Sequence, residues 1–210
     1  MKKLFTILIL CLTVVTSFAQ SEALQRWHGD KYSMFIHFGV YSSLGGVWNS
    51  EPVRRGYSEQ IQAHAGIYSD VYEDVARQFA PYDFDADKIA ELAKEAGMRS
   101  IVITSKHHDG FCIFRTATTK FNSWDMPEEP RDFIAELSEA CKRHGLKFGL
   151  YFSIIDWHDP YGHPISSHNV DPSTPEHHKL NMQQINELCS NYGPISELWF
   201  DMGSLTPEQS

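Results

Sequence analysis

Apolar residues recur at the spacing of an amphipathic helix in three segments of the chain, and a glycine closes each segment. The segments cover residues 85–97, 130–145 and about 175–193, and the closing glycines are Gly97, Gly145 and Gly193. A glycine after the last apolar turn can take the left-handed backbone conformation that ends a helix. The pattern therefore predicts three helices. On the third, the residues predicted to face the core are Leu180, Ile185, Leu188 and Cys189.

Short apolar runs typical of buried strands alternate with these helices. They cover residues 34–38, 100–104, 147–152 and 197–200. Strands that alternate with helices form a parallel sheet through right-handed crossovers, and such a sheet is buried on both faces. The pattern predicts an α/β fold.

The spacing of the units indicates which α/β architecture to expect. The three closing glycines stand 48 residues apart, so eight such units would need about 380 residues, within the range of the (β/α)8 barrel. We therefore expect a TIM-like barrel of which this chain holds only the first four βα units. A doubly wound open sheet is the alternative, but residues 36–39 (IHFG) follow the first strand in place of a glycine-rich phosphate turn. Four strands alone would leave two sheet edges unpaired, so either a homo-oligomer or a missing C-terminal half is expected.

The first 19 residues have the features of a secretory signal peptide. Lys2 and Lys3 precede a largely apolar run over residues 4–15, and Ala19 ends a small-residue cleavage site before Gln20. This run is shorter than the roughly 20 apolar residues that a membrane-spanning helix needs. We expect residues 1–19 to be removed and residues 20–210 to form the barrel domain. The protein would then be exported to the periplasm or the cell exterior, without a membrane anchor.

Charge and cysteine content narrow the range of partners. Removal of the leader would leave 16 basic residues, two fewer than the 18 of the whole chain, against 27 acidic ones, so the net charge moves from −9 to −11. A field of this sign repels polyanions, which excludes nucleic acid as a partner. The leader-free chain keeps Cys112, Cys141 and Cys189. An odd number without close spacing does not predict a disulfide framework.

Polar side chains gather where the predicted strands end. His37 ends the first strand, His107 and His108 follow the second, Asp156 follows the third and Asp201 follows the fourth. In a (β/α) barrel, the carboxyl ends of the strands build the active site. Histidines and carboxylates can hydrogen-bond hydroxyl groups while a nearby aromatic ring covers an apolar face. The combination is typical of a sugar-binding site.

Asp201 directly follows the apolar run and is the candidate nucleophile of a retaining glycosidase. In such enzymes a second carboxyl group stands about 5 to 5.5 Å away and protonates the leaving oxygen. The structural alternative is an aspartate that caps the next turn. Adjacent residues of an extended strand point to opposite faces, so His107 and His108 reach one site only if the chain turns at Asp109 and Gly110.

Other interpretations of these residues stay open at this point. The histidines, with Asp109 nearby, could hold zinc in a metal-dependent hydrolase. Against this, the first strand offers the lone His37 where metal-dependent barrel hydrolases usually carry a His-x-His pair, and we expect no metal. Trp48, Trp124 and Trp157 each lie in a segment that follows a strand, where an indole can either stack on a sugar or pack in the core. The histidines between residues 158 and 178 are expected to be solvated loop residues.

Five stretches of the sequence resemble the catalytic domain of the α-L-fucosidase family. They are residues 34–41 (MFIHFGVY), 82–97 (YDFDADKIAELAKEAG), 104–111 (TSKHHDGF), 148–153 (FGLYFS) and 198–201 (LWFD). The similarity is collinear from about Arg26 to Asp201. Its most specific element is the Lys-His-His-Asp-Gly-Phe stretch.

The resemblance implies a retaining exo-glycosidase that removes terminal α-L-fucose from glycans without a metal or an organic cofactor. Asp201 matches the nucleophile of the family. The residues that match the fucose pocket are His37, Glu59, His107, His108 and the aromatic Tyr151.

Two departures from the family pattern carry expectations of their own. The family commonly has a tryptophan after the pocket glutamate, whereas this chain has Gln60, so we expect either that Trp48 supplies the ring or that the linkage preference differs. The general acid of the family comes from a later strand or loop, which places it outside this chain. Conceivable substitutes are Glu51, Asp109 and Asp156. A chain without the acid could also be a non-catalytic fucose-binding remnant.

Overall fold

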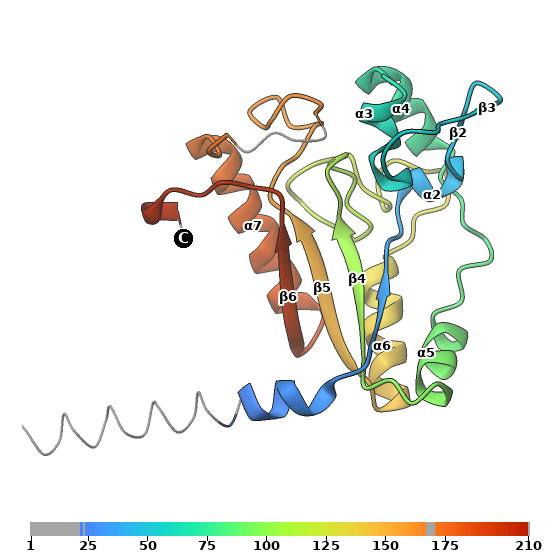
Figure 1. Ribbon diagram of the computed structural model, residues 1–210, viewed down its shortest axis with the longest axis vertical. Coiled ribbons are helices and arrows are strands. Elements are labelled where there is room, and N and C mark those ends of the chain that lie inside the picture. The colour runs from blue at the N-terminus through green and yellow to red at the C-terminus, as the bar shows by residue number, and fades with distance from the viewer. Residues whose placement is uncertain (1–21, 23, 167–170, 210) are drawn as a thin grey trace, which may run out of the picture.

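A computed structural model describes residue 22, residues 24–166 and residues 171–209 of the chain (Figure 1). Its centre is a four-stranded parallel sheet in the order β1-β4-β5-β6. The strands are β1 (Ser33–Ile36), β4 (Ser100–Lys106), β5 (Lys147–Ser153) and β6 (Ile195–Asp201). All four predicted strands are present, and each lies beside the next one in the sequence. The predicted α/β fold with a parallel sheet is confirmed.

The helices α5 (Ala86–Glu95), α6 (Phe133–His144) and α7 (Pro175–Asn191) alternate with these strands, as predicted. Each begins at a capping side chain, because Asp85, Asp132 and Thr174 accept hydrogen bonds from backbone amides of the first turn. The glycines that follow the helices have positive φ angles of 78°, 72° and 76°. The second helix starts at Phe133 rather than near Pro130 because its cap is Asp132.

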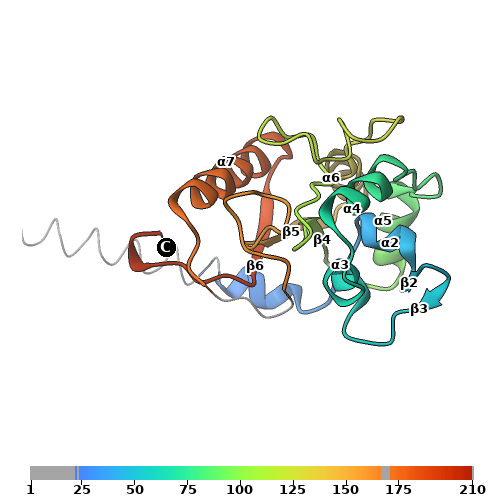
Figure 2. The same cartoon turned by 90° about the horizontal axis from the view of Figure 1, so that it is seen from above.

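A long connection between β1 and α5 covers the carboxyl end of the sheet (Figures 1 and 2). It contains α2 (Val40–Leu44), β2 (Val47–Trp48), β3 (Glu51–Pro52), the 3₁₀ helix η1 (Ser58–Gln60), α3 (Ile61–His64) and α4 (Ser69–Arg77). A second 3₁₀ helix, η2 (Pro207–Gln209), ends the described chain. The strand arrows all point toward the end of the sheet on which this connection lies, so it can contribute residues to a site there.

The buried side of α7 differs from the prediction. Its fully buried residues are His177, Asn181, Gln184 and Leu188, whereas Cys189 is exposed and Leu180 and Ile185 are half-buried. The expectation that the histidines of residues 158–178 are solvated is wrong for His163 and His177, which are buried; His158 and His178 are half-buried, and His168 lies outside the described residues. The physical reason is that polar side chains on this helix satisfy buried polar groups of the sheet, which a search for apolar periodicity does not detect.

The predictions of a leader, of no membrane anchor and of no disulfide framework concern other parts of the chain. The predicted leader, residues 1–19, lies outside the described residues. Within the described part, no helix is both long and apolar enough to cross a membrane. Cys112, Cys141 and Cys189 are all free thiols, which agrees with the prediction that they form no disulfide framework.

Candidate active site

Six of the seven predicted site residues meet at the carboxyl end of the sheet. We call this set the pocket cluster: His37, Glu59, His107, His108, Tyr151 and Asp201. His37 follows β1, the two adjacent histidines follow β4, Tyr151 lies on β5 and Asp201 ends β6. Glu59 comes from η1 in the long connection. Residues far apart in the sequence therefore converge because parallel strands end at one edge of the sheet.

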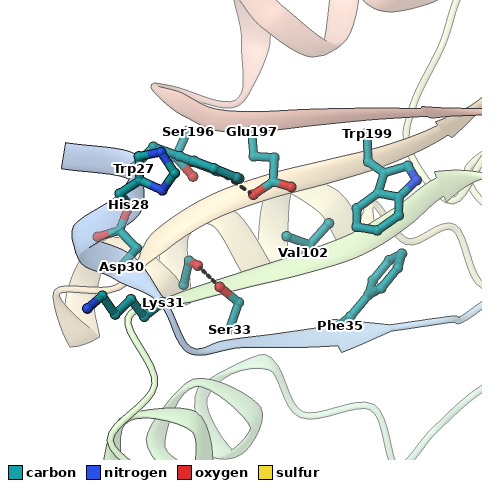
Figure 3. A pocket seen from close by; sticks show the side chains of 11 residues that line it. Trp27, His28, Asp30, Lys31, Ser33, Phe35, Val102, Ser196, Glu197 and Trp199 are labelled. Atoms are coloured by element: carbon teal, nitrogen blue, oxygen red, sulfur yellow. Dashed lines mark hydrogen bonds between the residues drawn. The ribbon is translucent and has the colours of Figure 1, made fainter. Parts of the chain in front are cut away.

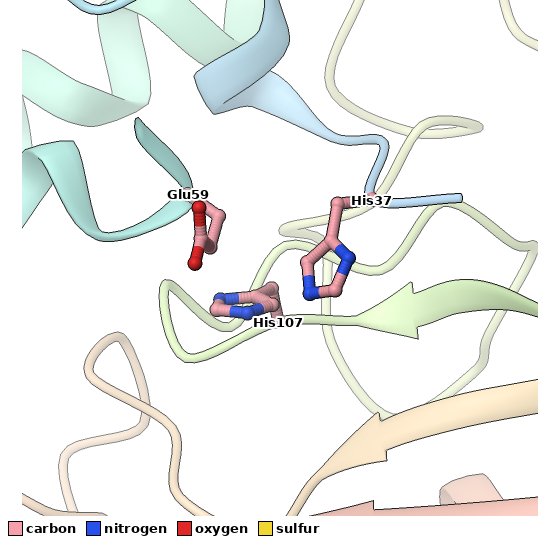
Figure 4. Close-up of side chains that lie close together, drawn as sticks. All are labelled: His37, Glu59 and His107. Atoms are coloured by element: carbon pink, nitrogen blue, oxygen red, sulfur yellow. The ribbon is translucent and has the colours of Figure 1, made fainter. Parts of the chain in front are cut away.

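Glu59, His37 and His107 form the side of the cluster shown in Figure 4. One carboxylate oxygen and one ring nitrogen from each histidine all lie within 4.8 Å of one another. His107 stacks on Tyr151, with ring centroids 5.3 Å apart and planes at 7°. Such a set of donors and acceptors can bind vicinal hydroxyl groups, and its geometry could also hold a cation.

The turn expected after β4 is present and brings both adjacent histidines to the pocket. The Gly110 amide donates to the His107 carbonyl at 3.0 Å, and Gly110 has a φ of 81°. The ladder register also shifts between Thr104 and Lys106. The centroids of the His107 and His108 rings lie 4.1 Å apart as a result. The bulge and the turn remove the strict alternation that would have separated the two rings.

Asp201 is a half-buried carboxylate whose two oxygens are held in place. The hydroxyl of Tyr151 donates to Oδ2 at 2.7 Å, and the Met202 amide donates to Oδ1 at 2.9 Å. Burial, reinforced by this hydrogen bond to Asp201, raises the pKa of Tyr151 well above its ordinary value. The phenol therefore keeps its proton and acts as a donor to Asp201 at all physiological pH values.

Burial also governs the charge of the two adjacent histidines. It lowers the pKa of His107 well below its ordinary value, and electrostatic repulsion from His108 and His37 lowers it further. Burial lowers the pKa of His108 to about 4, although the negative charge of Asp201 acts in the opposite direction. Both imidazoles are neutral at neutral pH, so each has one donor nitrogen and one acceptor nitrogen.

Among the described residues, Trp48 makes no hydrogen bond or ring contact with a member of the pocket cluster. It lies on the short strand β2, is half-buried and packs against the hydrophobic core. These contacts fit the core alternative for this indole, and the idea that Trp48 supplies the ring beside Glu59 stays a prediction.

The three conceivable substitutes for the general acid lie apart from the cluster or are bonded elsewhere. Glu51 is exposed on β3. Asp109 is buried, and its oxygens accept from the Tyr72 hydroxyl at 2.8 Å and from the Phe111 amide at 3.1 Å. Asp156 is engaged in the network described next. Asp109 and Asp156 therefore have both carboxylate oxygens bonded to other parts of the protein, and among the described residues Glu51 has no hydrogen bond to a member of the cluster.

A second set of polar residues, four of them ionisable, adjoins the pocket cluster at Lys106, and we call it the buried ion network: Lys106, Asp156, Asp159, His177 and Asn181. The Lys106 ammonium is 3.4 Å from Asp156 Oδ2 and 2.8 Å from Asn181 Oδ1. His177 contacts Asp159 through Nδ1 at 2.6 Å and the Ile154 carbonyl through Nε2 at 2.7 Å. Every member has at least two polar partners inside the protein.

One groove beside the sheet lies away from the polar strand ends. Figure 3 shows this groove of about 480 Å³, which the helical segment of residues 24–30 borders near the amino ends of the strands. The Trp27 indole donates to Glu197 at 3.3 Å there. At its other end, Phe35 and Trp199 lie 5.2 Å apart, and Phe35 also contacts His37 at 4.8 Å. An exposed aromatic wall therefore separates the groove from the pocket cluster.

The pocket cluster also contacts Tyr41 and Ser153, which sequence reasoning missed, and Trp157, one of the indoles expected either to stack on a sugar or to pack in the core. The Tyr41 ring packs edge-on against His107 at 5.4 Å, and the buried Trp157 ring lies 5.6 Å from His108. Ser153 Oγ lies 2.6 Å from His108 Nδ1. The stretches that resemble the fucosidase family contain Tyr41 and Ser153, so position in those stretches was the available signal.

Comparisons with known protein sequences all find similarity to one family. The sequence model of the family described as alpha-L-fucosidase matches residues 13–209. Alpha-L-fucosidase 1 of Arabidopsis thaliana is 29% identical over 184 residues, which cover 86% of this chain and 30% of that protein. Plasma alpha-L-fucosidase of Homo sapiens is 31% identical over 206 residues, covering 90% of this chain and 42% of that protein.

Solved structures agree with the sequence comparisons. Unliganded alpha-L-fucosidase AlfC from Lactobacillus casei superimposes with a TM-score of 0.79 at 38% identity, covering 90% of this chain and 64% of that one. A GH29 alpha-L-fucosidase from Bacteroides thetaiotaomicron gives a TM-score of 0.77 at 30% identity, covering 85% and 40%. This chain thus spans well under half the length of both curated relatives above and less than two thirds of both solved chains.

Proposed function

The chain belongs to the α-L-fucosidase family, and from this premise we propose that its pocket cluster binds and hydrolyses terminal α-L-fucosides. The proposed reaction retains the anomeric configuration, with Asp201 as the nucleophile. Asp201 attacks the anomeric carbon, the glycosidic bond breaks, and water then hydrolyses the glycosyl ester. The substrate would be a fucosylated glycan, and the reaction needs no metal or organic cofactor.

The observation that carries this proposal is the setting of Asp201. A nucleophilic carboxylate must be ionised and held at a fixed angle to the sugar ring. The rigid end of β6 supplies the position, and the Tyr151 and Met202 donors fix the carboxylate plane. The cap alternative accounts for the contact with the next amide but leaves the Tyr151 hydrogen bond without a role.

The polar and apolar sides of the site suit a 6-deoxy sugar. His37, Glu59 and the two adjacent histidines offer hydrogen-bond donors and acceptors to ring hydroxyls. Phe35 and Trp199 beside them are 41% and 47% exposed, although large aromatic side chains are usually buried. Fucose carries a methyl group where most hexoses carry a hydroxymethyl group. This methyl would lie against the aromatic wall without leaving a polar group unpaired.

The general acid and the closure of a barrel belong to the same proposal. Within the described residues, β1 and β6 each have one sheet edge without a partner strand. Phe35 and Trp199 face the groove between these edges, where further strands of a (β/α)8 barrel would bury them. We place the general acid in that further part, since Asp109 and Asp156 are bonded elsewhere and Glu51 makes no contact with the cluster among the described residues.

Hydrolysis of 4-nitrophenyl α-L-fucopyranoside by the full chain tests the role of Asp201. A related enzyme, AlfC, has been solved with this substrate as an alanine variant of an aspartate. An aryl leaving group needs little protonation, so the absence of an acid, which costs about 10² to 10⁴ in rate, is least harmful here. We expect Asp201→Asn to reduce turnover at least about 10³-fold, whereas the exposed Asp87→Asn should leave it unchanged.

The same assay separates the alternatives. A wild-type chain that binds L-fucose but releases no nitrophenol would be the non-catalytic binding remnant. Turnover lost on treatment with EDTA and restored by Zn²⁺ would identify a metal-dependent hydrolase. The spacing of His37, Glu59 and His107 is the observation that favours the second alternative. Intact mass spectrometry that finds a fucosyl adduct on Asp201 would exclude both.

Export to the periplasm or the cell exterior is part of the proposal and is supported by the leader sequence alone. Expression of the full chain in a Gram-negative host should place a shortened chain in the periplasmic fraction. Its N-terminus should be Gln20.

A further inference from the structure

The contact between Ser153 and His108 defines which nitrogen of His108 carries the proton. Ser153 is fully buried at the end of β5 and pairs with Asp201 across the sheet. Its Oγ lies 2.6 Å from His108 Nδ1 and 2.9 Å from the carbonyl oxygen of Ile155. A serine hydroxyl has a single proton, so it can donate to only one of these two atoms.

The Ile155 carbonyl decides the assignment because it can only accept. Two buried oxygens 2.9 Å apart with no proton between them would repel each other and would both lose a hydrogen bond. Ile155 is itself fixed, since it is buried and its amide donates to the Met202 carbonyl at 3.0 Å. The hydroxyl proton of Ser153 therefore points to Ile155.

The nitrogen of His108 must then be the donor in the other contact. Nδ1 carries its proton and donates to Ser153 Oγ, and a neutral imidazole in this tautomer has its lone pair on Nε2. Within the part of the chain that the structure describes, Nε2 has no hydrogen-bond partner. The ring lies against His107 on one side and Trp157 on another, and the charge of Asp201 acts on it.

We propose that Ser153 is a positioning residue that holds His108 as its Nδ1–H tautomer, so that Nε2 accepts a hydrogen bond from one hydroxyl of the bound sugar. The tautomer follows from the contacts alone, whereas the sugar hydroxyl rests on the function proposed above. His108 thereby selects a group that can donate. A fluorine or a methoxy group at the same ring position would leave Nε2 unpaired.

His177, in the buried ion network, is a histidine whose two ring nitrogens both have partners within the protein. Its Nδ1 faces a carboxylate oxygen of Asp159, and its Nε2 faces the Ile154 carbonyl. The side-chain amide of Asn181 also lies 3.1 Å from Nε2, so both nitrogens of His177 have partners within the protein. His108 differs because only one of its nitrogens has a protein partner.

Long-range ¹H–¹⁵N correlation spectra of the full chain test the tautomer without reference to activity. The two nitrogens of a neutral imidazole resonate far apart, and comparison with His108→Gln assigns the signals of this ring. We expect the protonated nitrogen to be Nδ1 in the wild type. In Ser153→Ala, a mixture of tautomers or the Nε2–H form should replace it, and Ser153→Cys, with a weaker acceptor of similar size, should fall between the two.

Ser105→Ala is the matched control. Ser105 is equally buried and donates to the Tyr151 carbonyl at 2.8 Å, but it has no contact with His108. This variant should keep the wild-type tautomer. An Nε2–H tautomer in the wild type, or an unchanged tautomer in both Ser153 variants, would overturn the proposal.

Binding of L-fucose and of its 2-, 3- and 4-deoxyfluoro derivatives tests the second step. One derivative should bind the wild type about 3- to 10-fold more weakly than L-fucose does, the effect of one lost hydrogen bond. That difference should disappear in Ser153→Ala. If the wild type binds no fucose while the spectra show Nδ1–H, the proposed function fails and the tautomer assignment stands. Equal discrimination by the wild type and Ser153→Ala would refute the role of Ser153 in recognition.

Discussion

The pocket cluster and the buried ion network both contain histidine and aspartate and adjoin each other at the end of β4, yet they differ in how many of their polar groups have hydrogen-bond partners within the protein. Lys106 and His107 are neighbours in the sequence, and one belongs to each set. In the network every polar group has protein partners, whereas Nδ1 of His107 is buried without a partner. Histidine and aspartate at a strand end therefore do not by themselves indicate function. Unsatisfied buried groups that face a pocket do, because a ligand can supply their partners.

The buried carboxylates show the same contrast in their electrostatics. Burial alone would raise the pKa of Asp156, but the Lys106 ammonium and the amides of Asp159 and His158 hold it below the ordinary value. Among the described residues, the hydrogen-bond partners of Asp109 are the neutral Tyr72 hydroxyl and the Phe111 amide, and burial raises its pKa to about 7. Gly110 brings these residues together, since a Cβ there would lie only 2.1 Å from Asp156 Oδ1.

The largest effect is expected from Lys106→Met, which should break the buried ion network. The substitution leaves the carboxylate of Asp156 buried without its cation, and loss of one partner of a buried pair typically costs about 3 to 5 kcal/mol. The free energy of unfolding from urea denaturation, followed by circular dichroism, measures this loss. Lys147→Met is the matched control. Lys147 pairs with Asp30 at the surface, where a pair contributes about 0 to 1 kcal/mol.

Addition of Asp156→Asn to the Lys106 variant sharpens this test. Removal of the second charge should restore part of the lost stability, because an amide is much less costly to bury than an unpaired carboxylate. If Lys106→Met and Lys147→Met reduced the free energy of unfolding equally, the network would stabilise the fold no more than a surface ion pair does.

The sequence predicted one of these two regions far better than the other. The pocket cluster follows from a local signal, since His37 and Asp201 each end an apolar run and strand ends meet at one edge of a parallel sheet. Glu59 had no such signal, and only the family resemblance identified it. The buried network depends on contacts such as Lys106 with Asn181, which lie 75 residues apart.

Hydrophobic periodicity misplaced the buried side of α7 for the same reason. The pattern selects apolar residues for the core, and it favoured Cys189 over Asn181 and His177. A buried ammonium on a neighbouring strand changes that preference, because it needs polar partners more than the helix needs another apolar contact. The need for polar partners depends on residues that are distant in the sequence, so it produces no periodic pattern of apolar residues along the helix.

An intermediate effect is expected from Asp109→Asn, and it depends on pH. The carboxyl of Asp109 titrates near 7 in the folded chain and near 3.8 in the unfolded chain, so between these values the folded chain binds more protons. The stability of the wild type should therefore fall as pH rises from about 4 to about 7, by on the order of 1 kcal/mol per unit. Asparagine mimics the protonated acid, and the variant should lack this fall.

The comparison of the two proteins isolates this contribution from those of other groups. His107 and His108 have lowered pKa values, so they make stability rise with pH over the range in which free histidine titrates. Both proteins carry these histidines, and their effect cancels in the difference. Urea denaturation at pH 4.5, 6 and 7.5 gives the two curves. Parallel curves would mean that Asp109 is ionised in the fold and has a charged partner after all.

The smallest effect on stability is expected from His37→Ala, which should change binding instead. The His37 side chain is exposed and, among the described residues, makes ring contacts but no hydrogen bond through its side chain. Truncation of such a residue should alter the free energy of unfolding by no more than about 0.5 kcal/mol. The affinity for L-fucose should fall about 10-fold, the effect of one hydrogen bond to the sugar.

His158→Ala is the matched control, since His158 stacks on Phe121 at 4.0 Å and contacts Glu73 at 3.0 Å away from the pocket. It should lose about 1 kcal/mol of stability and keep its affinity. If His37→Ala lost stability while His158→Ala lost affinity for L-fucose, the proposal would fail. Histidines with protein partners would then serve binding, and those without would serve stability.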